Sequence, residues 1–138
     1  MFKDKTNMQF LITAAGLGSR IRDAGIKPLK PFVKIKGKPA LIHSLDSFNI
    51  EEKDKVFLTL LNKKYSSKCL KEIKNDINCK VIPYYLEELS RGQLETTYKT
   101  IIENNISNSI VIHNCDSYYK FNRNSIKNLL EDFDIVVP

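Results

Sequence analysis

The chain has 138 residues, of which 42% are hydrophobic, and it carries a formal net charge of +6 at pH 7. This length holds one domain with one core, over residues 1–138, and the composition excludes a disordered protein. No apolar run approaches the roughly 18 residues that span a bilayer, and the first residues lack a secretory apolar segment, so we expect a cytoplasmic protein with no membrane partner.

The positive charge is unevenly distributed. Residues 1–80 hold 17 Lys and Arg against 8 Asp and Glu, whereas residues 81–138 hold 5 against 8. A basic face can bind nucleic acid, but these cations lie beside a glycine loop and lack the interleaved aromatic residues of a base-stacking surface. We therefore expect no nucleic-acid partner, and a basic nucleic-acid-binding module remains the alternative.

The stretch from Gln9 to Lys38 organises the chain. Apolar Phe10, Leu11 and Ile12 predict a buried strand, which leads into a loop of small residues and two glycines: Ala14, Ala15, Gly16, Leu17, Gly18, Ser19 and Arg20. Such a loop exposes successive backbone N–H groups and makes an anion-binding concavity. Residues 20–38 then carry seven Lys and Arg against one acid, Asp23. We interpret this stretch as the floor of a nucleotide site.

Two other nucleotide motifs are disfavoured. In a dinucleotide-binding G-x-G-x-x-G turn the third glycine would stand at position 21, where the chain has Ile21, so close packing of helix on strand is not provided for. No G-x-x-x-x-G-K-[ST] sequence occurs, which excludes a P-loop.

The opening pattern resembles that of the nucleotidyltransferases that join an NTP to a phosphorylated sugar or similar small molecule. Their pattern is a hydrophobic strand, A-A-G-x-G-x-R, a spacer, K-P-[LF], an apolar pair and G-K-P. Here it stands as Leu11 to Arg20, Lys30-Pro31-Phe32, Val33 with Ile35, and Gly37-Lys38-Pro39. The resemblance extends more loosely to Asp116, and it implies a glycosyltransferase-A-like nucleotidyltransferase fold.

The rest of the chain alternates between predicted strands and helices. A short strand is predicted at Phe32–Ile35, and Pro39 can start a helix whose apolar face is Leu41, Ile42, Leu45 and Phe48. His43 lies off that face and is expected to be exposed. A strand at Val56–Leu61 and a helix at Ser66–Ile77 follow.

The second half continues this alternation. Cys79–Ile82 predicts a strand that ends at Pro83 or lies at an edge. A helix after Gly92-Gln93 is expected to turn Leu94, Tyr98, Ile101 and Ile102 inward. Ser109–Ile112 predicts a further strand, Ser125 a cap for a helix bearing Ile126, Leu129 and Leu130, and Asp134–Val137 a last strand.

This alternation predicts a three-layer, Rossmann-like α/β fold with a mostly parallel sheet. Ligands of such sheets bind beyond the carboxyl ends of the strands. If the first strand and the strand at Ser109–Ile112 are neighbours, the glycine loop and Asp116 share one crevice.

Several residues are candidates for chemistry at that crevice. Asp116 follows an apolar strand, and its carboxylate suits Mg²⁺, which a triphosphate requires. The resemblance implies that Asp116 holds this metal, that Lys30 contacts the α-phosphate or the acceptor phosphate, and that Gly92-Gln93 reads the base. Lys27 fits the spacing to Gly37 less well than Lys30. At the lip of the loop, the Arg20 guanidinium can bind two phosphate oxygens at once.

His113 and Cys115 are interpreted as structural, not as ligands of a transition metal. The three cysteines, Cys69, Cys79 and Cys115, have no C-x-x-C spacing, and reduced thiols are the plain interpretation.

The sequence thus predicts a nucleotidyltransferase with Arg20 and Lys30 as catalytic residues, Ala14, Ala15, Gly16, Gly18, Ser19, Gly92 and Gln93 as nucleotide-binding residues, and Mg²⁺ on Asp116. Its partners would be an NTP and a phosphorylated acceptor, and by resemblance alone it would serve surface polysaccharide synthesis. Family members continue for roughly another hundred residues with a second metal-binding Asp. We therefore expect either a C-terminally truncated chain or a partner surface, such as a second copy, that completes the sheet. A non-catalytic nucleotide-binding module remains an alternative.

Overall fold

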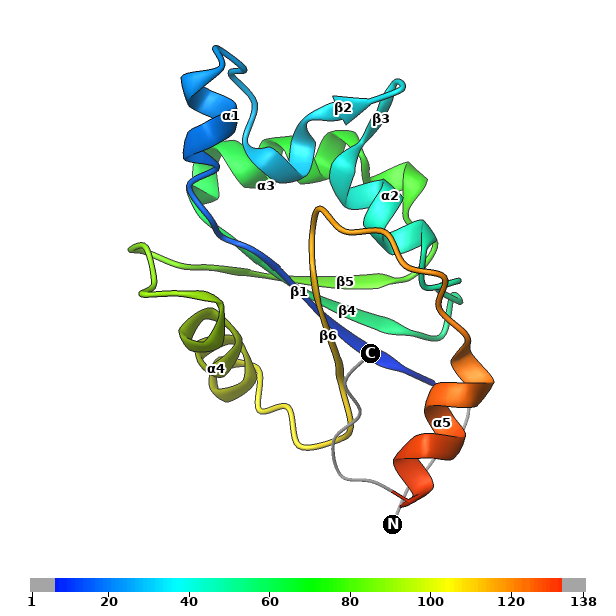
Figure 1. Cartoon of the computed structure of the whole chain (residues 1–138). Helices are drawn as coiled ribbons and strands as arrows, with labels where there is room; N and C mark the ends of the chain where they lie inside the picture. Colours follow the sequence, from blue (N-terminus) through cyan, green and yellow to red (C-terminus); the bar gives the residue numbers. More distant parts are fainter. Residues whose placement is uncertain (1–6, 133–138) are drawn as a thin grey trace.

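The computed structural model describes residues 7–132, and its central feature is a parallel sheet between helices (Figure 1). The sheet has four strands in the order β5-β4-β1-β6, and each neighbouring pair is parallel. The strands are β1 (Gln9–Ala14), β4 (Lys55–Leu60), β5 (Lys80–Tyr85) and β6 (Val111–Asn114). One face is covered by α2 (Ala40–Asp46) and α3 (Lys63–Glu72), and the other by α4 (Gln93–Glu103). The predicted three-layer α/β fold with a mostly parallel sheet is confirmed.

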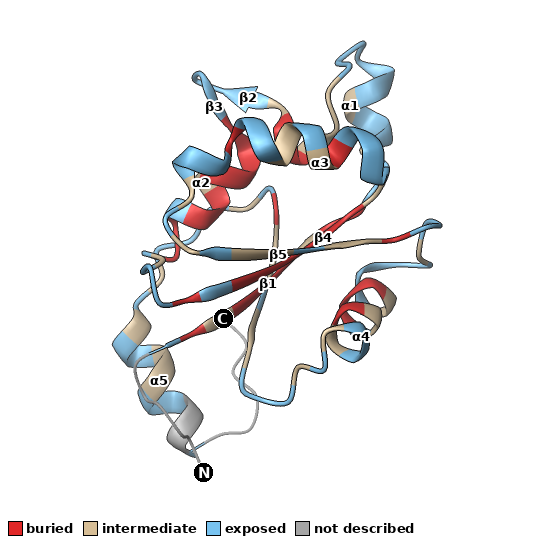
Figure 2. Cartoon of the chain, turned by 180° about the vertical axis from the view of Figure 1, so that it is seen from behind, coloured by how far each residue is buried: buried red, intermediate tan, exposed pale blue. Residues whose placement is uncertain are grey.

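The main core lies between the central strands and the α2 and α3 layer. Alternate residues of β1 and β4 point into it and are 0–6% exposed, and Figure 2 shows these strands as the buried centre of the molecule. Leu41, Ile42 and Leu45 of α2 pack onto them and are equally buried, as is Phe48, which was predicted on the same helix but follows its end. Each such side chain contributes about 1.5–3 kcal/mol by leaving water, so this core fixes the position of β1 and of the loop that follows it.

The opposite face of the sheet is covered in a different way, through threonines. Thr96, Thr97 and Thr100 of α4 are buried. The Thr100 hydroxyl donates to the Thr96 carbonyl at 2.8 Å and lies 2.5 Å from the Thr59 hydroxyl of β4. These hydroxyls satisfy one another and the helix carbonyls, so their burial does not carry the cost of an unpaired polar group.

As a result, the predicted orientation of α4 is wrong. Leu94, Tyr98 and Ile102 are 84%, 64% and 55% exposed, and Ile101 is half-buried. The apolar stripe of this helix points outward because satisfied threonines occupy the inner face.

Three boundaries in the first half differ from the prediction. Phe32 belongs to a 3-10 turn, Lys30–Phe32, and the expected strand is reduced to β2, Lys34–Ile35, which pairs with β3, Lys38–Pro39. The helix expected at Ser66–Ile77 starts earlier, because Asn62 caps it by accepting from the Tyr65 N–H at 3.3 Å. It ends at Glu72 and is followed by a separate 3-10 turn, Lys74–Asp76.

The second half shows similar shifts. β5 continues through Pro83 and lies at an edge of the described sheet, so the edge alternative predicted for this strand is confirmed. The strand predicted at Ser109–Ile112 is β6. The cap of α5 (Arg123–Asp132) is Asn122, whose side-chain oxygen accepts from the Ser125 N–H at 3.0 Å, so Ser125 is not the cap. The strand predicted at Asp134–Val137 lies outside the described residues.

Candidate functional site

The adjacency of β1 and β6 defines the candidate site. Thr13 of β1 is in register with Asn114 of β6, so the loops after the two strands leave the sheet at the same edge. The predicted condition, that the first strand and the strand before Asp116 are neighbours, is therefore confirmed.

The glycine loop requires glycine at position 18 for two reasons. Gly18 has φ +59°, a conformation that side chains disfavour, and a Cβ built on it would lie 3.3 Å from Lys30 Cβ. Its carbonyl accepts from the N–H groups of Ile21 and Arg22 at 3.0 and 3.1 Å, which starts the short helix α1 (Ser19–Asp23). Gly18 thus joins the loop to Lys30 by close packing.

The middle of this loop offers free backbone donors. Ala14 and Ala15 are buried, whereas Gly16 and Leu17 are exposed. Within residues 7–132 no hydrogen-bond acceptor is found for the N–H groups of Gly16, Leu17 and Gly18. A Cβ built on Gly16 meets nothing within 4 Å. The loop therefore has the open, donor-rich geometry that an anion can approach.

Lys30 and Asp116 meet at this edge. Lys30 Nζ lies 2.5 Å from Asp116 Oδ2, and each side chain is 36% exposed. Phe32, two residues after Lys30, is buried in the core and anchors the 3-10 turn that carries the lysine. Two residues that are far apart in the sequence, and that the motif singled out separately, thus form one charged pair.

Polar side chains of β1 and α2 hold the chain that leads to Asp116. The buried Ser44 hydroxyl donates to the Asn114 carbonyl at 2.9 Å, and the Thr13 hydroxyl donates to the Asn114 side-chain oxygen at 3.4 Å. The sequence interpretation missed both residues. Their signal was a polar residue inside an apolar strand, for Thr13, and inside an apolar helix face, for Ser44.

His113 supports the same segment from the other side. Its ring packs edge-on against Phe48 and Tyr119, with centroids 4.7 and 5.1 Å apart, and its Nε2 lies 3.2 Å from the Ser117 carbonyl. Burial lowers the pKa of His113, so the ring is neutral near pH 7 and donates this hydrogen bond. His113, at the end of β6, thus contacts Ser117 and Tyr119, which follow Asp116 in the chain.

Cys115 is enclosed in the core. Burial, reinforced by the Asp116 charge, raises the pKa of its thiol to about 12. A thiol that stays protonated is a poor metal ligand. The structural interpretation of His113 and Cys115 agrees with these contacts.

Arg20 is not brought to the ion pair. It lies on α1 beside Ser19, it is exposed, and within residues 7–132 its side chain has no hydrogen-bond or ion-pair partner. Its guanidinium is free to meet a ligand at the lip of the loop.

The Gly92-Gln93 turn follows β5, two strands away from β1 in the same sheet. Gly92 has an extended backbone that any residue can adopt, and a Cβ built there meets nothing within 4 Å. Glu95 accepts from the Arg91 N–H at 2.7 Å. This bond first, and then the Lys99 and Arg91 side chains, lower the pKa of Glu95 to about 2. The turn is thus a helix start held by local contacts, and its Gln93 side chain is exposed.

His43 also departs from its prediction. It is half-buried, and its Nε2 lies 2.9 Å from the Ile35 carbonyl, so it ties the β2–β3 hairpin to α2.

The donor set at Asp116 fits one type of metal only. Within the described part of the chain no group of three or more His, Cys, Asp and Glu side chains could cage an ion. Mg²⁺ often binds one carboxylate together with phosphate oxygens and water. Asp116 therefore fits a magnesium ion that arrives with a phosphate ligand, and not a metal held by protein alone.

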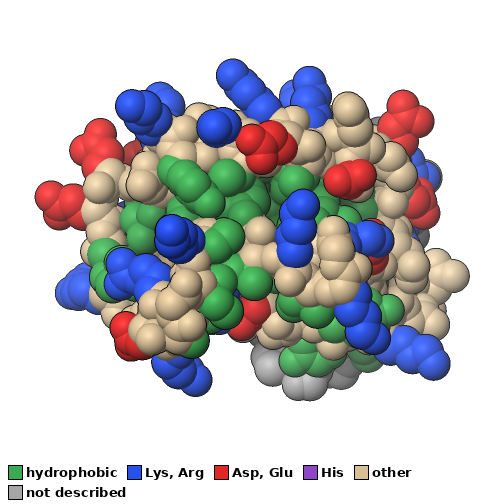
Figure 3. All heavy atoms as spheres, turned by 90° about the horizontal axis from the view of Figure 1, so that it is seen from above, with side chains coloured by type: hydrophobic (Ala, Val, Ile, Leu, Met, Phe, Trp, Pro, Cys, Tyr) green, Lys and Arg blue, Asp and Glu red, His purple; other side chains and the backbone are tan. Residues whose placement is uncertain are grey.

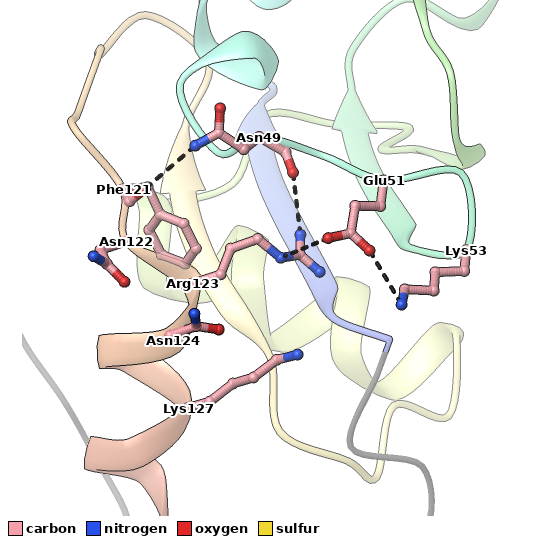
Figure 4. A pocket seen from close by; sticks show the side chains of 8 residues that line it. All are labelled: Asn49, Glu51, Lys53, Phe121, Asn122, Arg123, Asn124 and Lys127. Atoms are coloured by element: carbon pink, nitrogen blue, oxygen red, sulfur yellow. Dashed lines mark hydrogen bonds and ion pairs between the residues drawn. The ribbon is translucent and has the colours of Figure 1, made fainter.

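A polar hollow lies at the other end of the sheet. It is lined by Asn49, Glu51, Lys53, Phe121, Asn122, Arg123, Asn124 and Lys127 (Figure 4). These residues lie before β4 and around the start of α5, near the amino ends of the strands, where open α/β sheets do not usually bind ligands. The hydrogen bonds drawn in Figure 4 show it as a structural junction.

The cations near the glycine loop do not form one continuous patch. Figure 3, which views the molecule from the side of α1, β2 and β3, shows Lys and Arg side chains scattered around hydrophobic ones. No helix of the described residues is long and apolar enough to cross a membrane.

The sequence of the chain is similar to that of a curated protein. No protein-family model matches the chain. The bifunctional enzyme IspD/IspF of Pelagibacter ubique (strain HTCC1062) is 30% identical over 137 residues, which cover 96% of this chain and 34% of that protein. The chain thus spans about a third of the length of this curated relative.

Several solved structures superpose on this chain. HddC from Yersinia pseudotuberculosis superposes with a TM-score of 0.71 at 25% identity, over 91% of this chain and 53% of its own. The nucleoside-diphosphate-sugar pyrophosphorylase from Vibrio cholerae RC9 superposes with a TM-score of 0.65 at 21% identity, over 83% of this chain and 50% of its own. The inositol-1-phosphate CTP transferase from T. maritima superposes with a TM-score of 0.61 at 18% identity, over 80% of this chain and 44% of its own. The chain therefore has the fold of the nucleotidyltransferases, and the resemblance predicted from its opening motif is confirmed at that level.

Proposed function

We propose that this chain carries the nucleotide-binding part of an enzyme that transfers a nucleotidyl group to a small phosphorylated acceptor such as a sugar phosphate. A phosphate oxygen of the acceptor attacks the α-phosphorus of the NTP. A new phosphorus–oxygen bond forms, the bond to the bridging oxygen breaks, and pyrophosphate leaves with its electron pair.

The observation that carries the proposal is the meeting of Lys30 with Asp116 beside free backbone donors. A lysine lies 2.5 Å from an aspartate, next to the N–H groups of Gly16, Leu17 and Gly18, which have no acceptor among the described residues. One edge thus has both an anion-binding and a cation-binding group. Triphosphate chemistry needs both. The fold shared with nucleotidyltransferases adds support, because this edge is where such sheets bind ligands.

Each residue has a proposed role. The loop from Ala14 to Ser19 cradles phosphates with its N–H groups, and Lys30 neutralises charge on the reacting phosphate. Arg20, exposed on α1, meets charge that grows on the leaving pyrophosphate, and Gly92-Gln93 contacts the base. Asp116 would hold Mg²⁺, which supplies charge neutralisation on the phosphate oxygens when it is bound. In these roles the residues position the reactants and neutralise the charge of the phosphates, which is most of what phosphoryl chemistry requires from a protein.

The biological setting is proposed from the family resemblance alone. We infer that the activated product serves the synthesis of capsule or other surface polysaccharide. The name of the nucleoside-diphosphate-sugar pyrophosphorylase is compatible with a sugar-phosphate acceptor.

The test measures binding and turnover with the same protein. NTP affinity with Mg²⁺ is measured by calorimetry for CTP, UTP, dTTP, GTP and ATP, and pyrophosphate release is followed with a panel of sugar phosphates and phosphorylated alcohols. We expect one NTP base to bind best, and we expect little or no pyrophosphate release, because the proposal assigns this chain the nucleotide-binding part alone. Micromolar binding of mixed-sequence DNA or RNA at physiological salt, without NTP binding, would contradict the proposal.

The matched variants are Lys30→Met and Lys27→Met. Both remove one positive charge from the same segment, but only Lys30 reaches Asp116. The proposal requires a clear loss of NTP affinity for Lys30→Met and a small change for Lys27→Met.

A further inference from the structure

The position that a metal ion would need beside Asp116 is filled by a side chain. Lys30 Nζ lies 2.5 Å from Asp116 Oδ2, so the ammonium group occupies the space that an ion bound to this oxygen would take. A free cation can reach this oxygen only if the ammonium group leaves it.

The ammonium group is placed so that it can leave. Both side chains are 36% exposed, so neither is locked in the core. The backbone of Lys30 is held in the 3-10 turn that buried Phe32 anchors, whereas Nζ lies at the end of a flexible chain. The nearby N–H groups of Gly16, Leu17 and Gly18 mark where an anion would draw it.

The surroundings also disfavour a free cation. Arg20, Arg22, Lys27 and Lys34 are exposed on the same segment, and Asp116 is not part of a larger acidic group within residues 7–132. One carboxylate in a basic neighbourhood, already paired, binds a lone divalent ion poorly.

We propose that Lys30 is the resident counter-ion of Asp116, and that the site takes a divalent cation only as a complex with a polyphosphate nucleotide. The triphosphate offers Lys30 a new anionic partner and at the same time brings the cation the oxygens that the protein lacks. This inference rests on the proposed function and adds an order of events to it: free metal does not load first.

The experiment uses Mn²⁺, which binds oxygen ligands as Mg²⁺ does and is detected by electron paramagnetic resonance. Free Mn²⁺ is titrated into the unaltered 138-residue chain, Lys30→Met and Lys27→Met, each with and without a non-hydrolysable nucleoside triphosphate. Amide NMR spectra establish that each variant is folded, and Lys30→Gln replaces Lys30→Met if the latter is not.

We expect the unaltered chain to bind Mn²⁺ only when the triphosphate is present. Lys30→Met should bind free Mn²⁺ about two- to fivefold tighter, which is the scale of a partly exposed ion pair. Lys27→Met should not, and the gain should vanish when Asp116→Asn is combined with Lys30→Met.

Two results would overturn the inference. One is tight binding of free Mn²⁺ to the unaltered chain, and the other is an equal gain for Lys27→Met and Lys30→Met, which would reduce the effect to general charge. A lack of triphosphate binding in the unaltered chain overturns the proposed function, whereas the comparison of free Mn²⁺ between the two lysine variants judges the ion pair on its own.

Discussion

Arg123 makes a two-pronged ion pair with Asp54 across the amino ends of the strands. Its two terminal nitrogens lie 2.7 and 3.0 Å from the two carboxylate oxygens, and the side chains are 11% and 0% exposed. The same oxygens accept from the N–H groups of Met8 and Glu51, each at 2.8 Å. One buried carboxylate thus ties the starts of β1, β4 and α5 together.

Replacing Arg123 by Met should therefore destabilise the chain strongly. The change leaves a buried carboxylate without its cation, which typically costs about 3–5 kcal/mol. Urea unfolding measures the change. The control is Lys53→Met in the same hollow, because Lys53 pairs with Glu51 at 3.2 Å but is 46% exposed, and such a pair contributes about 0–1 kcal/mol. Equal effects of the two substitutions would contradict this account of the junction.

Stability should fall in acid through the same aspartate. Burial alone raises the pKa of Asp54, but hydrogen bonds from Arg123 and from the Glu51 and Met8 N–H groups outweigh it and hold the pKa below its ordinary 3.8. The contribution of a depressed carboxylate is complete above its unfolded pKa and disappears as the pH falls through its folded pKa. The free energy of unfolding should thus decrease as the pH falls below about 4.

Two variants separate the source of this acid sensitivity. Asp54→Asn should flatten the dependence of the unfolding free energy on pH. Glu95→Gln is the comparison. The pKa of Glu95 is lowered to about 2, so this residue adds to the acid dependence of the unfolding free energy with the same sign as Asp54, but from the surface of α4. A profile for Asp54→Asn that parallels that of the unaltered chain would show that Asp54 is not a source of the slope.

The two loop glycines should respond differently to alanine. Gly18→Ala must adopt φ +59° and place its Cβ 3.3 Å from Lys30 Cβ, so we expect lower stability by roughly 1 kcal/mol and weaker NTP binding. Gly16→Ala meets nothing within 4 Å and should unfold like the unaltered chain, so any loss of NTP affinity would report a ligand contact. Calorimetry and urea unfolding make the comparison, and a Gly18→Ala chain with unchanged stability and affinity would contradict it.

The outward stripe of α4 gives a direct test of the helix orientation. Leu94→Lys and Ile102→Lys, at positions 84% and 55% exposed, should change the unfolding free energy by less than about 0.5 kcal/mol each. Thr100→Lys places a charge against Thr59 and should prevent stable folding. Strong destabilisation by both stripe substitutions would mean that these side chains are covered.

Most of the fold was predictable because its signals are local. Apolar runs predicted β1 and β4, the period of α2 predicted its buried face, and the alternation of elements predicted a parallel sheet. The orientation of α4 was not predictable from hydrophobicity, because its inner face is made of threonines whose hydroxyls bond to each other and to carbonyls. Such satisfaction depends on a partner strand that the helix sequence does not contain.

The candidate site was predictable only in part. The motif singled out Gly18, Lys30 and Asp116, but nothing in their spacing shows that Lys30 and Asp116 are paired, since this needs β6 beside β1. The supports of Asp116, Ser44 and Thr13, looked like polar interruptions of apolar elements. Their role comes from hydrogen bonds across 70 and 101 positions of sequence.

The measurement that tests the central claim most directly is an amide NMR titration of the chain with a Mg²⁺-bound nucleoside triphosphate. A nucleotide site at the carboxyl end of the sheet predicts the largest shifts at Gly16 to Arg20, Lys30 and Asp116, with smaller ones at Gly92 and Gln93. Residues of the polar hollow, such as Lys53 and Asn124, should remain unchanged. Shifts concentrated in that hollow, or no shifts at millimolar nucleotide, would contradict the account.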